Sequence, residues 1–179
     1  MQRYVAFLRG MNLGRQRVKN DELCACFASM GFSEVSAFLA SGNIVFDTEQ
    51  DDPNSLRARI QCELQRALNY EVPTFLRCAD EVRAIAQYQP FTALQLEQSK
   101  GKPQVALLSK KPAPAAKKAV LELSSAEDRL DVHGRELYWL PSGGMSESEL
   151  DLRQIEVALG PMTIRTRNTF ERLAAKYLD

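Results

Sequence analysis

The chain has 179 residues, of which 45% are hydrophobic, and its 23 Lys and Arg residues balance 23 Asp and Glu residues, with a single His. This composition excludes a disordered or fibrous chain, and the length indicates one large domain or two small ones. No apolar run approaches the roughly 20 residues that span a bilayer, and a single His excludes any metal site or proton relay that needs two imidazoles.

The first predicted elements are a strand and a helix. Residues 4–9 are mostly apolar and rich in Val, Phe and Tyr, which is typical of a strand, and Gly10 ends the run. A polar, basic loop follows. Asn20 is then a favourable N-cap for a helix, and Gly31 supplies the C-terminal stop of that helix.

Two strands, a helix and a further strand come next. The two strands are expected at residues 35–40 and 44–46, on either side of a Ser-Gly-Asn turn, because Gly and Asn tolerate a positive φ. Pro53 favours the first position of a helix with one apolar stripe. Residues 72–76 form a strand that belongs at a sheet edge, because Pro73 has no N–H to donate. The order is therefore β-α-β-β-α-β.

The same order recurs in the second half of the chain. A helix near residues 80–88 and a loose, polar stretch at residues 92–103 precede the repeat. Strands are then predicted at residues 104–108, 129–132, 136–140 and 162–165, and helices at residues 115–123 and after a capping box at Ser146 and Glu149. A terminal helix follows, with Asn168 as its cap and Glu171 at the third position after it.

Two copies of one pattern predict an α+β protein of two ferredoxin-like (split β-α-β) subdomains with packed antiparallel sheets, plus a C-terminal helix. The packing is expected because the helices cover one face of each sheet, whereas the first strand is apolar on both faces. The expected divisions are residues 1–78 for the first subdomain, 79–103 for a connecting helix and loop, and 104–179 for the second subdomain with the terminal helix.

Several motifs resemble those of a known family. Residues 7–14 read FLRGMNLG and residues 41–46 read SGNIVF. They resemble the patterns F-L-R-G-[IM]-N-[VL]-G and S-G-N-x-x-F of an uncharacterised bacterial family, catalogued as domain of unknown function 1697. The likeness continues through Ser148 to residues 163–170, which look like the family's T-x-R-N-W-N-T-V, with Thr166 and Arg167 in place of Asn and Trp. The resemblance implies a fold of two ferredoxin-like halves and brings no established activity, substrate or catalytic residue.

Basic residues gather in two segments although the net charge is zero. Every charged residue at positions 1–20 is basic, and the same holds for positions 98–121. Such segregation creates a local positive field, which suits phosphate-bearing ligands. The alternative is that both segments are solvated loops with ordinary Lys and Arg residues.

The predicted topology brings the end of the first strand and the turn between the second and third strands to one edge of a sheet. Arg9, Gly10 and Asn12 are therefore expected beside Ser41 and Asn43, where these groups form a small polar site. Turn chemistry alone is the alternative explanation of the Asn and Ser residues.

Arginine side chains are the remaining candidates for binding an anion at this edge. The glycines match neither G-x-G-x-x-G nor a P-loop, and acids at the start of the first helix repel an anion there. Side chains must then hold the ligand, so Arg15 and Arg17 join the candidate ligand-binding residues at this edge. Arg165 is a further candidate, because Arg165 and Arg167 alternate outward along the last predicted strand and extend a basic surface.

These observations predict a cytoplasmic, non-catalytic module that binds a phosphate-bearing small molecule or a nucleic acid, without a cofactor, a metal or a membrane, as a monomer or homodimer. The cytoplasm is expected because the first residues carry charge where a signal peptide is apolar, and the four cysteines form no C-x-x-C pair. An enzyme acting on a small polar substrate at the same edge and a protein-interaction scaffold are the alternatives, although the sequence shows no nucleophile elbow or paired carboxylates.

Overall fold

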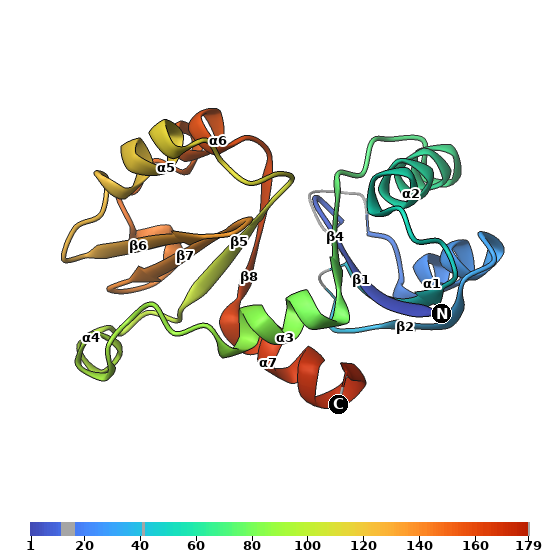
Figure 1. The fold of residues 1–179 in the computed structure, drawn as a ribbon, viewed down its shortest axis with the longest axis horizontal. Coiled ribbons are helices and arrows are strands. Elements are labelled where there is room, and N and C mark those ends of the chain that lie inside the picture. Colours follow the sequence, from blue (N-terminus) through green and yellow to red (C-terminus); the bar gives the residue numbers. More distant parts are fainter. Residues whose placement is uncertain (12–16, 41, 179) are drawn as a thin grey trace. The chain divides into compact units, whose positions relative to one another are not determined.

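The computed structural model of the protein describes residues 1–11, 17–40 and 42–178 (Figure 1). Two compact units make up the chain: unit 1 is Met1–Arg83 with Leu173–Asp179, and unit 2 is Ala84–Arg172. The division therefore falls after Arg83 and again after Arg172. The division predicted from the sequence has a connection at residues 79–103 between subdomains at residues 1–78 and 104–179.

Unit 1 contains a four-stranded antiparallel sheet with the strand order β2-β3-β1-β4. This is the predicted ferredoxin-like order, and β4 lies at the edge, as Pro73 indicates. The elements of unit 1 are β1 (Gln2–Leu8), α1 (Asn20–Ser29), β2 (Ser33–Ala37), β3 (Asn43–Thr48), α2 (Pro53–Leu68) and β4 (Thr74–Cys78), from which α3 (Ala79–Gln87) continues past the division.

Helices α1 and α2 cover one face of this sheet (Figure 1). The predicted stripe on α2 is buried, and it packs with α1 and with alternate residues of β1 and β3 in one core. The members of this core include Leu23, Phe27, Phe46, Leu56, Ile60 and Leu64. The intervening strand residues, such as Val5, Phe7 and Val45, are buried as well, so both faces of the sheet carry buried apolar side chains.

Unit 2 repeats the topology, with an antiparallel sheet in the order β6-β7-β5-β8. Its helices α5 and α6 lie on one face of that sheet (Figure 1) and bury Val120, Ile155 and Leu159 against it. The elements of unit 2 are α4 (Ala93–Gln98), β5 (Gln104–Leu108), α5 (Pro114–Leu121), β6 (Asp128–His133), β7 (Glu136–Pro141), α6 (Leu152–Leu159), β8 (Met162–Thr166) and α7 (Arg167–Leu173).

The internal repeat extends to individual hydrogen bonds. At the end of β1, the backbone N–H of Leu8 donates to Gly42 O at 2.7 Å, and at the end of β5, the N–H of Leu108 donates to Arg135 O at 2.9 Å. Both bonds tie the end of the first strand of a unit to the connection between its second and third strands.

Helix α4 corrects the expectation of a loose stretch at residues 92–103. Thr92 is its N-cap: Thr92 Oγ1 accepts from the N–H of Gln95 at 3.2 Å, and Gln95 Oε1 accepts from the N–H of Thr92 at 2.9 Å. This reciprocal capping box satisfies two backbone donors and stabilises a helix that has no buried residue.

Helix α6 begins later than its sequence pattern predicts. Ser146 lies in a short 3-10 helix, Met145–Glu147, and Glu149 lies outside any helix. Asp151 is the N-cap of α6, because its Oδ1 accepts from the N–H groups of Arg153 at 2.9 Å and Gln154 at 3.1 Å.

Two further expected caps are helical residues instead. Asn20 is the first residue of α1, where Lys19 is the N-cap, and the Asn20 amide donates to Leu39 O at 3.1 Å. Asn168 is the exposed second residue of α7, and Glu171 pairs with Arg167 at 3.1 Å. Both residues therefore lie inside their helix and not at its cap.

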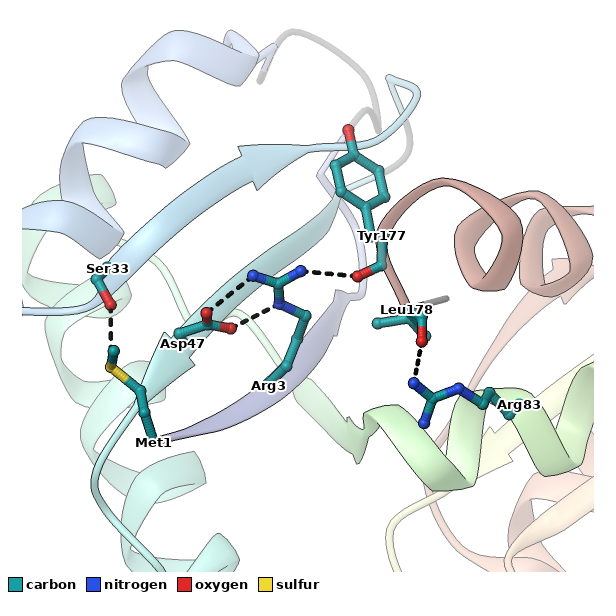
Figure 2. A network of polar contacts seen from close by, with 7 residues as sticks. All are labelled: Met1, Arg3, Ser33, Asp47, Arg83, Tyr177 and Leu178. Atoms are coloured by element: carbon teal, nitrogen blue, oxygen red, sulfur yellow. Dashed lines mark hydrogen bonds and ion pairs between the residues drawn. The ribbon is translucent and has the colours of Figure 1, made fainter.

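The last residues of the chain pack on unit 1 (Figure 2). Arg3 binds Asp47 through two hydrogen bonds of 2.7 and 2.8 Å, and it donates a third, of 2.7 Å, to Tyr177 O. Arg83 donates to Leu178 O, and Ser36 Oγ lies 3.0 Å from the Tyr177 hydroxyl. These contacts attach the π-helix Ala174–Leu178 to the sheet and to α3. None of the helices in the described ranges combines the length and the apolar character that a membrane span requires.

Candidate functional site

The predicted meeting of the first strand and the 41–43 turn occurs at one edge of the sheet in unit 1. We call this edge the rim, and it comprises the described residues 8–11, 17–20, 38–40, 42 and 43. Its centre is the 2.7 Å hydrogen bond from Leu8 N to Gly42 O, next to the β1–β3 pair Phe7 and Asn43. The Asn20 amide binds Leu39 O and so ties the start of α1 to the same turn.

Two glycines give the rim its backbone path. Gly10 has φ 80° and Gly42 has φ 71°, a backbone conformation that residues with a side chain rarely adopt. A Cβ on Gly42 would lie 2.7 Å from Met11 Cγ and 3.1 Å from Leu8 Cβ, so the two segments approach closely only because Gly42 has no side chain.

Asn43 supports the turn from inside the unit. Its side chain is fully buried, and its amide donates to Phe38 O at 2.9 Å, while Phe38 N donates to Asn43 O at 2.8 Å. These bonds satisfy backbone groups of the turn, which is the turn chemistry that the sequence leaves open as an alternative.

The positive charge of the rim comes from Arg9, Arg17 and Lys19. Arg9 is half-buried, whereas Arg17 and Lys19 are exposed. Glu22 accepts from the backbone N–H of Lys19 at 2.9 Å and occupies the start of α1. A carboxylate at that position opposes an anion at the helix start, so an anion at the rim must be held by the basic side chains.

Arg165 lies in the other unit, on β8. Its guanidinium donates to Thr163 Oγ1 and to Ile164 O, both at 2.9 Å, and burial lowers the pKa of Arg165 to about 10. Arg77 occupies the equivalent position in unit 1, since Val5 pairs with Arg77 and Val105 with Arg165, and it likewise donates to the preceding carbonyl, Leu76 O. The Arg165 guanidinium is therefore held by groups of its own strand, β8. The role of Arg165 in binding a ligand stays a prediction.

Asn12, Arg15 and Ser41 lie outside the described residues. Of the eight candidate binding residues, Arg9, Gly10 and Asn43 lie where the end of β1 meets the turn before β3. Arg17 belongs to the same unit and precedes Asn20, which binds Leu39 O. Whether any of these side chains binds a ligand stays a prediction.

The single His, the single Trp and the four cysteines have the following surroundings. His133 stacks on Tyr88 with ring centroids 4.5 Å apart, and the buried Trp139 donates to Asp128 at 2.7 Å. The four cysteines are free, and burial raises the pKa of Cys24, Cys26 and Cys78, which disfavours the reactive thiolate form. Within the described ranges, no three His, Cys, Asp or Glu side chains are grouped as metal ligands.

Two cavities in unit 2 could not be predicted from the sequence, because their walls come from segments far apart in the chain. The larger, of about 720 Å³, is lined by acidic residues that also hold its loops: Asp128 accepts from Trp139 and Ser148, and Asp151 caps α6. The smaller, of about 500 Å³, is lined by Lys102 and Arg167 among others. The sequence signal for this smaller cavity is Lys102, which belongs to the second basic segment at positions 98–121.

These features define an α+β protein with two ferredoxin-like halves. The family described as protein of unknown function (DUF1697) matches residues 1–138, and the chain belongs to this family. The match includes both motifs at residues 7–14 and 41–46 and ends before Ser148 and residues 163–170.

A solved structure shows the same fold. The conserved bacterial protein SP0830 from Streptococcus pneumoniae is similar to this chain with a TM-score of 0.77 and 20% sequence identity, over 98% of this chain and 97% of that chain. Comparison with curated proteins gives no match.

Proposed function

We propose that the rim binds the phosphate group of a nucleotide-sized ligand and that the protein acts as a non-catalytic binding module. The main support is that Arg9, Arg17 and Lys19 belong to the rim, where Gly10 and Gly42 have a positive φ. All charged residues of their segment, positions 1–20, are basic. Guanidinium groups hold phosphate through paired hydrogen bonds, and they are poor proton carriers because they stay protonated.

A nucleotide fits the described residues better than a nucleic acid does. Ferredoxin-like sheets read single-stranded RNA through aromatic side chains on an open sheet face. In unit 1, Tyr4 and Phe7 are 3% and 0% exposed, so neither ring is available for stacking on a base. The remaining surface is the rim, whose three described cations suit one phosphate group or a short chain of phosphates. The proposed setting is the cytoplasm, which the free cysteines support.

The test is a calorimetric titration with three probes: ADP, inorganic phosphate and a single-stranded uridine oligonucleotide. Arg17→Gln and Arg9→Gln are each expected to weaken ADP binding about tenfold, since a charged hydrogen bond contributes about 1.5–3 kcal/mol. Arg66→Gln is the matched control, because it removes the same charge from an exposed position on α2 in the same unit.

Three results would contradict the proposal. If ADP does not bind the wild-type protein at low salt, the rim is not a nucleotide-binding site. Equal losses of ADP affinity in Arg17→Gln and Arg66→Gln would show that the effect comes from the overall charge and not from the rim. Tighter binding of the oligonucleotide than of ADP, with a steep salt dependence, overturns the choice of a nucleotide-sized ligand.

A further inference from the structure

The smaller cavity of unit 2 carries a second binding site that the rim does not explain. This cavity of about 500 Å³ lies between the segment around α4 and the junction of β8 with α7. We call it the Arg167 pocket, and the lining residues that matter here are Leu96, Lys102, Pro103, Arg167, Asn168 and Glu171. All of them belong to unit 2, so the pocket is complete within that unit.

Arg167 is a rigidly held, buried cation in the wall of this pocket. It is 9% exposed, and its guanidinium donates to Gln89 Oε1 at 2.5 Å and to Ala86 O at 3.0 Å. The backbone N–H of Arg167 also donates to Pro103 O at 2.9 Å, which fixes the start of α7 against the segment before β5. A buried guanidinium fixed in this way needs little reorganisation to meet an anion.

One donor of Arg167 has no hydrogen-bond acceptor among the described residues. Its Nε is buried, and although Glu171 Oε1 lies 3.1 Å away as an ion partner, the contact lacks hydrogen-bond geometry. A buried donor without an acceptor is unfavourable by about 1–3 kcal/mol in general, so a further acceptor at this position stabilises the folded protein.

The charges around the pocket favour an anion. Lys102 and Arg167 contribute two positive charges and Glu171 contributes one negative charge, which leaves the named lining positive. Lys102 is exposed, whereas Arg167 is buried, so a ligand between them meets one solvated and one fixed cation. Asn168 adds an amide, and Leu96 and Pro103 add apolar surface.

We infer that the Arg167 pocket binds a small organic anion, with its carboxylate or phosphate group between Lys102 and Arg167 and its apolar part against Leu96 and Pro103. A mixed lining of apolar surface with a few fixed polar groups is typical of small-molecule sites. The site is independent of the rim, because no residue of the pocket belongs to unit 1.

The experiment is an NMR titration of the ¹⁵N-labelled full chain with benzoate, phenyl phosphate and neutral benzyl alcohol. The two anions are expected to shift the amides of Arg167 and Asn168 with saturation and to leave the amide of Gly42 at the rim unchanged, whereas benzyl alcohol shifts none of them. The stronger of benzoate and phenyl phosphate identifies the anionic group that the pocket prefers.

Variants assign the effect to the pocket. Lys102→Gln is expected to weaken anion binding about tenfold, and Lys102→Glu to abolish it. Lys100→Gln, an exposed change of the same charge two residues away and outside the lining, is the matched control and is expected to bind as the wild type does. Because both lysines are exposed, these variants test the pocket without disturbing the buried Arg167.

The inference is overturned if neither anion gives saturable shifts at Arg167 and Asn168, or if Lys102→Gln and Lys100→Gln lose affinity equally. Shifts confined to Gly42 and its neighbours would assign the anions to the rim and would equally overturn it.

Discussion

Gly42 combines a left-handed backbone with close neighbours on the adjacent strand end. Its φ is 71°, and a Cβ there would lie 2.7 Å from Met11 Cγ, 3.1 Å from Leu8 Cβ and 3.3 Å from Leu8 O. Met11 and Leu8 are both buried, so neither can move aside without disturbing the core of unit 1. The approach of the two rim segments therefore depends on this one residue.

Gly42→Ala is expected to lower the free energy of unfolding by about 2–4 kcal/mol, from the left-handed conformation and the steric contacts together. Gly31→Ala is the matched control: Gly31 has φ 82°, but nothing lies within 4 Å of its added Cβ, so its loss is about 1–2 kcal/mol. Urea unfolding of the two variants measures both values. Equal losses would show that contact with Met11 and Leu8 adds nothing to the backbone strain.

Tyr88 provides a test of the side-chain environment in unit 2. Burial, with the 2.8 Å hydrogen bond to Asp131 as a second cause, raises the pKa of Tyr88 from 10.0 to about 12. The protonated phenol is favoured in the folded state, so this stabilisation is fully present below pH 10 and is lost as the pH rises through about 12.

Ultraviolet titration of tyrosinate in the wild type and in Tyr88→Phe isolates this group, because the other tyrosines cancel in the difference. The difference curve is expected to be centred near pH 12, and Asp131→Asn is expected to move it toward 10. A difference curve centred at 10 in the wild-type comparison would contradict the buried, hydrogen-bonded phenol.

The asparagines show what residue type alone can predict. The residue type predicts that Asn20, Asn43 and Asn168 each lie in a turn or a cap, because an Asn amide commonly binds nearby backbone. Asn43 does stabilise its turn through Phe38 O. Asn20 instead reaches Leu39 O, 19 positions away, and Asn168 is an exposed helical residue. The residue type indicates the kind of bond, whereas the partner depends on which segments the fold brings together.

Helix α4 depends on its cap more than on packing. It has no buried residue, and its start is stabilised by the reciprocal bonds of Thr92 and Gln95. Short helices without an apolar face are marginal in water, so the cap decides whether this one forms. Opening of α4 is then a local event that leaves the core of unit 2 intact.

Thr92→Ala removes a side-chain cap, which generally contributes about 1 kcal/mol, so hydrogen exchange of the Leu96 and Ser99 amides is expected to accelerate about fivefold. The global unfolding midpoint should change little. Thr92→Ser retains the hydroxyl acceptor and should exchange as the wild type does. A large fall in global stability in Thr92→Ala would show that α4 is part of the cooperative core.

Strands were easier to predict than helix starts in this chain. The strands at residues 104–108 and 136–140 stand out because their side chains are buried on both faces and because the sequence after Gln104 and after Glu136 is apolar. Helix α4 lacks an apolar stripe, and α6 is capped by Asp151 and not by the predicted capping box at Ser146 and Glu149. Capping energies of about 1 kcal/mol are too similar for sequence spacing to choose between them.

The duplication could be predicted because each half carries its own complete pattern of strands, helices and turns. The attachment of the last residues to unit 1 could not, since its bonds to Arg3 and Arg83 use backbone carbonyls rather than particular residue types. Tyr177 O accepts from Arg3, and Leu178 O accepts from Arg83 (Figure 2). Any sequence supplies such carbonyls, so only the path of the chain reveals the contact. The cavities of unit 2 escaped prediction for the same reason.

Unit 1 is therefore completed by a segment from the opposite end of the sequence, and this arrangement can be tested with one reporter. Trp139 is the single tryptophan of the chain, and it is buried in the core of unit 2. Its fluorescence follows unfolding of unit 2, whereas circular dichroism follows both units. A change that weakens unit 1 alone should separate the two signals.

A chain that ends after Leu173 loses the acceptors for Arg3 and Arg83 and the buried side chain of Leu178. Two hydrogen bonds and one buried leucine correspond to about 2–4 kcal/mol, so unit 1 is expected to lose stability by this amount. The circular dichroism midpoint in urea should fall, while the Trp139 fluorescence midpoint stays in place. Tyr177→Phe, which removes only the hydroxyl contact with Ser36, should give a smaller shift in the same direction. If the fluorescence midpoint moves as far as the circular dichroism midpoint, the terminal segment stabilises both units alike, and its assignment to unit 1 alone is wrong.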